Sequence, residues 1–146
     1  MSGNIGNIFM KAIINSPLHP LLGSGFALIT VAGRKTGLPV STLVNVVKDG
    51  DGLTVVSLRN RTWWRNLRGG RPATLRLAGK QLSVRSEVLE AQDDVVQAFV
   101  HFFQRFPNYA KYYGVQPAAD GFVAREVLDQ LADKHVVIRL AEVGRV

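Results

Sequence analysis

Five short apolar stretches follow one another between residues 26 and 90, and glycine occurs in each connection between them. The Asp-Gly-Asp-Gly sequence after the second stretch and Ala-Gly-Lys after the fourth are typical of hairpin turns. A chain of hairpins pairs neighbouring strands in antiparallel fashion. The pattern therefore predicts an antiparallel sheet, with strands at residues 26–31, 40–48, 53–58, 73–77 and 81–90.

The spacing of apolar residues changes after residue 92. Helical spacing predicts helices over residues 93–106 and 122–133, an aromatic loop or short helix in "NYAKYYGVQP" between them, and a last strand over 135–143. A short first helix is predicted from Ile5, Phe9 and Ile13, whose apolar stripe packs on protein or lies on a membrane surface. The whole chain, residues 1–146, is then one α+β domain. We expect an antiparallel barrel of about six strands with flanking helices.

Composition excludes several classes of protein. The 146-residue chain has no cysteine, so disulfides and thiolate chemistry are ruled out, which fits a reducing cytoplasm. It has no apolar run of the ~20 residues that a membrane-spanning helix needs, and no cleavable signal is visible at its N-terminus. We therefore expect a cytoplasmic protein.

Positive charge is concentrated in one part of the chain. Between Arg34 and Arg85 there are eleven Lys or Arg residues and two Asp residues, a local charge of +9, whereas residues 86–146 carry −3. A field of this kind favours an anionic partner, such as a phosphate, a polyanionic cofactor, an acidic lipid surface or a nucleic acid.

The usual catalytic sets are missing from the sequence. His19, His101 and His135 match no metal-ligand spacing, and His101 is interpreted as a packed or surface histidine. No nucleophile elbow and no P-loop occur. If the protein is an enzyme, a bound cofactor is expected to carry the reaction.

Two basic segments are candidates for binding an anion. "GRKTG" at residues 33–37 is either a solvated hairpin turn or a cradle in which Arg34, Lys35 and Thr36 supply donors to a ligand. "SLRNRTWWRNLRGGR" places arginines around Trp63 and Trp64. The Trp pair either borders a flat anionic ligand or plugs the end of the barrel.

The stretch from Phe26 to Glu90 resembles the deazaflavin-dependent nitroreductase and quinone reductase family. Three motifs carry the resemblance: G-R-K-[ST]-G after the first strand, the D-G-D turn, and W-[YW]-x-N-L before the next hairpin. "FPNYAKYY" is more loosely similar to a Y-P-x-Y-x-x-Y segment of that family. The resemblance implies a split, Greek-key-like β-barrel related to flavin-binding oxidases.

The same resemblance implies a cofactor, a reaction and a set of site residues. The cofactor would be the deazaflavin F420, and the reaction a hydride transfer to a small flat acceptor such as a quinone, nitroaromatic or enone. Tyr109 and Tyr112 would lie by the acceptor as proton donors or hydrogen-bond partners. The cofactor-binding residues would be Arg34, Lys35, Thr36, Ser57, Arg59, Arg61, Trp63 and Trp64. A homodimer is implied as well, and no metal is expected.

The sequence also departs from the family pattern. Val40 stands where members often carry a further basic residue, and "RNRT" at 59–62 replaces a stretch that often holds Gly-Gly and Pro. Arg59 and Arg61 would then replace the lost charge. Flavin mononucleotide (FMN), haem or biliverdin stay open as ligands. A non-catalytic cofactor or lipid carrier is the second hypothesis, and nucleic-acid binding is the least favoured because no known module is visible.

Overall fold

The computed structural model describes residues 25–50, 52–77 and 79–143. The N-terminal apolar stripe predicted at Ile5, Phe9 and Ile13 lies outside these residues. The described residues form six strands and four helical segments, in this order: β1 (Gly25–Ala32), β2 (Pro39–Asp49), β3 (Gly52–Leu58), η1 (Trp63–Leu67), β4 (Pro72–Leu77), β5 (Lys80–Leu89), α2 (Gln92–Arg105), η2 (Pro107–Tyr113), α3 (Arg125–Lys134) and β6 (His135–Glu142).

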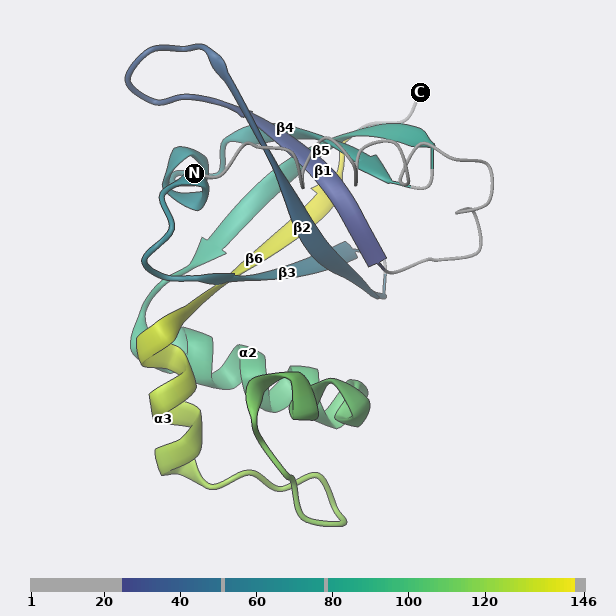
Figure 1. Cartoon of the computed structure of the whole chain (residues 1–146), viewed down its shortest axis with the longest axis vertical. Coiled ribbons are helices and arrows are strands. Elements are labelled where there is room, and N and C mark those ends of the chain that lie inside the picture. Colours follow the sequence, from purple (N-terminus) through teal and green to yellow (C-terminus); the bar gives the residue numbers. More distant parts are fainter. Residues whose placement is uncertain (1–24, 51, 78, 144–146) are drawn as a thin grey trace.

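The six strands close into one antiparallel barrel (Figure 1). Its order is β1-β2-β3-β6-β5-β4, so the last strand inserts between β3 and β5, and β4 returns to pair with β1. The α+β split-barrel prediction is therefore confirmed. Strand boundaries differ from the predicted ones by one residue at most.

Alternation of residues along the strands builds the core of the barrel. On β1, Ala27, Ile29 and Val31 are buried, while the residues between them are not. Alternate residues on the other strands are buried in the same way, because successive side chains of a strand point to opposite faces. The barrel core also contains both tryptophans of η1.

A second apolar core lies outside the barrel, where the helices cover part of its outer face. Phe99, Phe102 and Phe103 of α2 pack there with Val47 of β2 and Val137 of β6. Figure 1 shows α2, η2 and α3 together below the barrel, on the side opposite the β1–β2 turn. Asp93 and Asp94 stand in the first turn of α2, where negative charge is favourable.

Helix α3 begins at Arg125, whereas the sequence pattern predicted a start at residue 122. A turn occupies the preceding backbone: Ala118 donates to the carbonyl of Phe122, and Phe122 donates to the Asp120 carboxylate at 2.9 Å. Phe122 is consequently 66% exposed and takes no part in the apolar face of the helix. Within the described residues, no helix is long and apolar enough to cross a membrane.

The barrel and the helices are joined at Arg59, which directly follows β3. Its Nη2 atom lies 2.9 Å from the carbonyl oxygens of Glu90 and Ala132 and 3.1 Å from that of His135. Its backbone N–H also donates to Lys134 at 2.7 Å. A single guanidinium thus connects the end of β3 with the end of β5, the end of α3 and the start of β6.

Candidate functional site

The G-R-K-T-G segment forms a tight turn between β1 and β2. Gly33 donates to the carbonyl of Leu38 at 2.8 Å, and the Thr36 hydroxyl accepts from the Leu38 N–H at 3.1 Å. Gly37 has a φ of +73°, which residues with a side chain adopt only with strain. The turn is therefore held by its own hydrogen bonds, and Arg34 and Lys35 are not needed to form it.

The turn is fixed against η1 by one further bond, from the Arg34 N–H to the Asn66 side-chain oxygen at 3.0 Å. A hollow of about 280 Å³ lies between the two segments, lined by Arg34, Lys35 and Thr36 and by Trp63 and Asn66 among others. Both cationic side chains are exposed, and neither forms an ion pair with any residue that the structure describes. The hollow thus presents two uncompensated positive charges.

The Trp pair belongs to the barrel core. Trp63 is 2% exposed and Trp64 is 1% exposed. The indole N–H of Trp63 donates to the Ser57 hydroxyl at 3.1 Å, and Ser57 in turn donates to the carbonyl of Leu58 at 3.1 Å. Ser57 is itself buried. The structure therefore supports the interpretation that the Trp pair closes the end of the barrel. The Ser57 hydroxyl holds Trp63 in place there.

Arginines cover the remaining face of Trp64. The guanidinium carbons of Arg65 and Arg68 lie 5.3 and 5.1 Å from its ring centroid. Arg68 also forms a two-bond ion pair with Glu90, both distances being 2.8 Å, and these hydrogen bonds lower the pKa of the Glu90 carboxyl. The Trp64 ring is thus stacked within the protein and offers no open face to a ligand.

The other two predicted arginines are engaged as well. Arg59 donates to three carbonyl oxygens, and Arg61 donates to the buried Thr42 hydroxyl at 3.1 Å. The structure therefore separates the eight predicted cofactor residues into two groups. Three line the hollow at the turn with open donors, namely Arg34, Lys35 and Thr36. The other five mainly make contacts within the protein, namely Ser57, Arg59, Arg61, Trp63 and Trp64.

Tyr109 and Tyr112 lie on η2, among the helices. The Tyr109 ring packs on Phe102 and Phe106, with centroids 5.5 and 6.0 Å apart, whereas Tyr112 is 72% exposed. The neighbouring Tyr113 is half-buried, and desolvation raises its pKa to about 12. Figure 1 places η2 below the barrel and the β1–β2 turn above it, so the structure does not bring these tyrosines together with Arg34.

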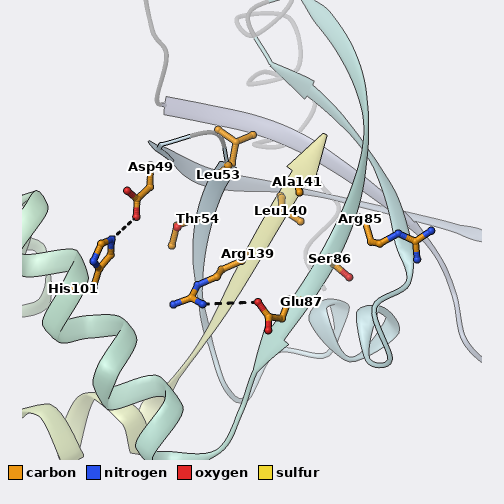
Figure 2. A pocket seen from close by; sticks show the side chains of 11 residues that line it. Asp49, Leu53, Thr54, Arg85, Ser86, Glu87, His101, Arg139, Leu140 and Ala141 are labelled. Carbon is orange, nitrogen blue, oxygen red and sulfur yellow. Dashed lines mark hydrogen bonds and ion pairs between the residues drawn. The ribbon is translucent and has the colours of Figure 1, made fainter. Parts of the chain in front are cut away.

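A larger hollow lies elsewhere, between the outer face of β3, β6 and β5 and the helix α2 (Figure 2). Its volume is about 650 Å³. His101 of α2 stands at its border, half-exposed, with Nε2 2.8 Å from the Asp49 carboxylate. Arg105, one helical turn further on, approaches the same carboxylate at 3.5 Å. We call this hollow the β3–β6–β5 groove.

Sequence reasoning missed this groove. It interpreted His101 as packed or superficial and Asp49 as a turn residue. The spacing of His101 and Arg105, four residues apart on a helix, was a signal that both can reach one carboxylate. Nothing in the sequence indicated that this carboxylate is Asp49. Among the described residues, no group of three His, Cys, Asp or Glu side chains could hold a metal ion.

The sequence profile of the F420H(2)-dependent quinone reductase family matches residues 13–119, well over half of the chain. The chain belongs to this family. The match covers the G-R-K-T-G turn, the Trp pair and the aromatic segment η2, so the family resemblance read from those motifs is confirmed. A comparison with curated proteins found no match.

Solved structures resemble this family member in fold. A protein of unknown function from Agrobacterium tumefaciens has a TM-score of 0.55 at 18% identity; the match covers 97% of this chain but 56% of that protein. A candidate pyridoxamine 5'-phosphate oxidase from Listeria innocua has a TM-score of 0.52 at 11% identity, with 94% and 93% covered. A candidate 5-nitroimidazole antibiotic resistance protein from Bacteroides thetaiotaomicron has a TM-score of 0.54 at 12% identity, with 92% and 80% covered.

The role of Ser57 in this family member can be tested by replacement with alanine. Ser57→Ala leaves the buried Trp63 N–H without its acceptor, so we expect the free energy of unfolding to fall by about 1–3 kcal/mol. Denaturant unfolding measures the change, with Ser83→Ala on the exposed side of β5 as the matched control. An unchanged stability combined with weaker cofactor binding would instead assign Ser57 to the ligand.

Proposed function

We propose that the chain is an F420-dependent oxidoreductase that reduces a small flat acceptor, such as a quinone, nitroaromatic or enone, in the cytoplasm. The observation that carries the proposal is the G-R-K-T-G turn within a chain of the quinone reductase family. Its Arg34 and Lys35 are exposed and without ion pairs among the described residues, and the turn is already held by other bonds. Two such cations suit the phosphate or the acidic tail of the cofactor.

The turn and the adjacent end of the barrel differ in what they can hold of that cofactor. The turn fits an anionic group, because it offers two cations, the Thr36 hydroxyl and a backbone that its own hydrogen bonds hold in place. Both indoles of η1 fill the end of the barrel beside this turn, so a ring cannot enter the barrel there. In this proposal the flat part of the cofactor therefore binds outside that end of the barrel.

Reduced F420, when bound, supplies the hydride. The acceptor also needs a proton, and this chain has to provide or position it. Tyr109 and Tyr112 remain the proposed donors, and η2 would then border the acceptor. Holding the acceptor in place and excluding water from it are the other contributions expected of the protein.

The cofactor assignment is tested by replacing both cations of the turn. Each charge-assisted contact contributes about 1.5–3 kcal/mol, so Arg34→Ala/Lys35→Ala should weaken F420 binding ten-fold or more. Fluorescence titration measures the dissociation constant, with FMN as the alternative ligand. Arg76→Ala, an exposed arginine on β4, serves as the matched control. Unchanged affinity for F420 in the double variant would overturn the assignment.

The tyrosine assignment is tested by removing the hydroxyls alone. If Tyr112 or Tyr109 donates the proton, replacement by phenylalanine should lower turnover about 10²-fold while cofactor affinity is retained. Steady-state oxidation of F420H2 by menadione provides the measurement. Full activity in both Tyr109→Phe and Tyr112→Phe would remove these residues from the chemistry.

The distance of η2 from the turn favours a second candidate function, a non-catalytic cofactor carrier. A carrier and a reductase differ in one measurement on the unaltered protein. A reductase oxidises F420H2 when menadione is added, whereas a carrier binds the cofactor without turnover.

We further propose that the protein is a homodimer. The barrel is closed, so a second copy would pack on the outer surface and not on a free strand edge. Large apolar side chains are exposed there, including Phe26 near the start of β1 and Leu58 at the end of β3. Sedimentation velocity at micromolar concentration should give the mass of two chains, and a single 16.0 kDa species would contradict the proposal.

A further inference from the structure

The two ends of the barrel are closed to different degrees. At the end where β3 leads into η1, both tryptophans and Leu67 are buried in the barrel core. At the opposite end lies a hollow of about 360 Å³, where the β2–β3 hairpin meets the end of β4 and the start of β5. We call it the open-end hollow. It shares no lining residue with the hollow beside Arg34.

Aliphatic side chains dominate the open-end hollow. Three leucines that line it belong to the barrel core but stay half-buried, and we call them the rim leucines: Leu53, Leu77 and Leu82. Val84 and Leu140 of the same lining are buried. Inward-facing leucines that stay partly exposed together form an apolar surface, which another apolar group can cover favourably.

The chain carries an apolar segment directly before this end of the barrel. Residues 1–24 precede β1. Strand β1 starts at the same end as the hollow, because Gly25 pairs with Val46, three residues before the end of β2. The N-terminal stripe, predicted from Ile5, Phe9 and Ile13, is therefore tethered to the open end and not to the end that the tryptophans close.

Composition favours protein over membrane as the partner of the N-terminal stripe. Helices that lie on a membrane surface are usually rich in Lys and Arg on their polar face. Among residues 1–24, Lys11 is the only Lys or Arg. An apolar stripe with so little charge beside it suits an apolar surface of the protein itself, and the rim leucines supply one.

The length of the segment fits the size of the open end. The nine residues from Ile5 to Ile13 would form a helix about 13 Å long. Six strands ~4.8 Å apart enclose a barrel roughly 10–15 Å across. The twelve residues that lead from Ile13 to Gly25 can extend over as much as ~40 Å. The stripe can therefore lie across the open end while it stays connected to β1, and this connection keeps its effective concentration there high.

We propose that the open-end hollow is an intramolecular docking site, in which the N-terminal stripe of the same chain covers the rim leucines. The stripe then closes this end of the barrel, as the Trp pair closes the other end. The inference goes beyond the proposed function and is independent of the cofactor, because neither the turn at Arg34 nor any of the proposed catalytic residues takes part in it.

The first experiment uses the side of the helix on which each residue lies. On a helix, Phe9 and Ile13 fall on the same side as Ile5, whereas their neighbours Met10 and Ile14 are turned away from it. The full chain is therefore compared as Phe9→Ser/Ile13→Ser and as the matched control Met10→Ser/Ile14→Ser. Docking predicts that the melting temperature falls by roughly 5 °C or more in the stripe variant alone. Fluorescence of added anilinonaphthalene sulfonate should rise in that variant, because the rim leucines become accessible.

The second experiment locates the stripe by a disulfide, because the chain has no cysteine of its own. Phe9→Cys is combined in turn with Leu53→Cys and with Leu82→Cys. After mild oxidation, at least one pair should form a disulfide within one chain, seen on non-reducing electrophoresis as a faster-migrating monomer. The matched control is Phe9→Cys with Gln81→Cys. Gln81 directly precedes Leu82 but is exposed, and its side-chain oxygen accepts from Arg76 at 2.8 Å.

Destabilisation confined to the stripe variant, together with an intrachain disulfide that the Gln81→Cys control does not form, supports the proposal. A disulfide that joins two chains would assign the hollow to a second copy and overturn it. Absence of a disulfide at both leucine positions overturns it too, and sedimentation of the unaltered protein with phosphatidylglycerol vesicles, lost in the stripe variant, would then assign the stripe to a membrane. Equal melting temperatures in the stripe variant and its control also contradict docking.

Discussion

The Trp63 and Trp64 indoles at the end of the barrel constrain where anything else can bind. Both rings are almost fully buried against the inward-facing side chains of the strands, and the N–H of Trp63 is satisfied by Ser57. Burying two indoles and an internal hydrogen bond closes this end of the barrel. A ligand at this end must then be held outside the barrel. At the opposite end, Leu77, Leu82 and Val84 line a hollow of about 360 Å³.

The fold also determines which arginines remain available for a ligand. Arg59 is bound to three carbonyl oxygens where barrel and helices meet, and Arg68 is paired with Glu90 across the surface of η1. Removing Arg59 leaves three part-buried carbonyl oxygens without this donor, so Arg59 cannot change partners at low cost, whereas the Arg68–Glu90 pair is exposed to solvent. Arg34 and Lys35 stand on a turn that is held by backbone bonds and by Thr36. Arg34 and Lys35 are thus adjacent exposed cations with no ion pair among the described residues.

Most of the fold could be predicted because its signals are local. Alternating apolar residues, the Asp-Gly-Asp-Gly turn and the phenylalanines of α2 each describe a segment by itself, and all of them appear where expected. The start of α3 was predicted three residues too early, since the turn at Ala118–Phe122 depends on the Asp120 side chain and not on apolar spacing. The roles of Ser57 and Arg59 could not be predicted, because their partners are chosen by the way the chain closes.

The β3–β6–β5 groove illustrates why the lining of a surface hollow escapes sequence reasoning. Its lining includes Gly52 and Ala141, which are far apart in the chain and become neighbours because β6 inserts between β3 and β5. It also includes Asp49 of a hairpin and His101 of a helix, which form an ion pair. Each of these residues has an ordinary local explanation, as a turn glycine, a strand alanine or a surface histidine. They come together only when the barrel closes and α2 packs against it, and neither step has a local signal in the sequence.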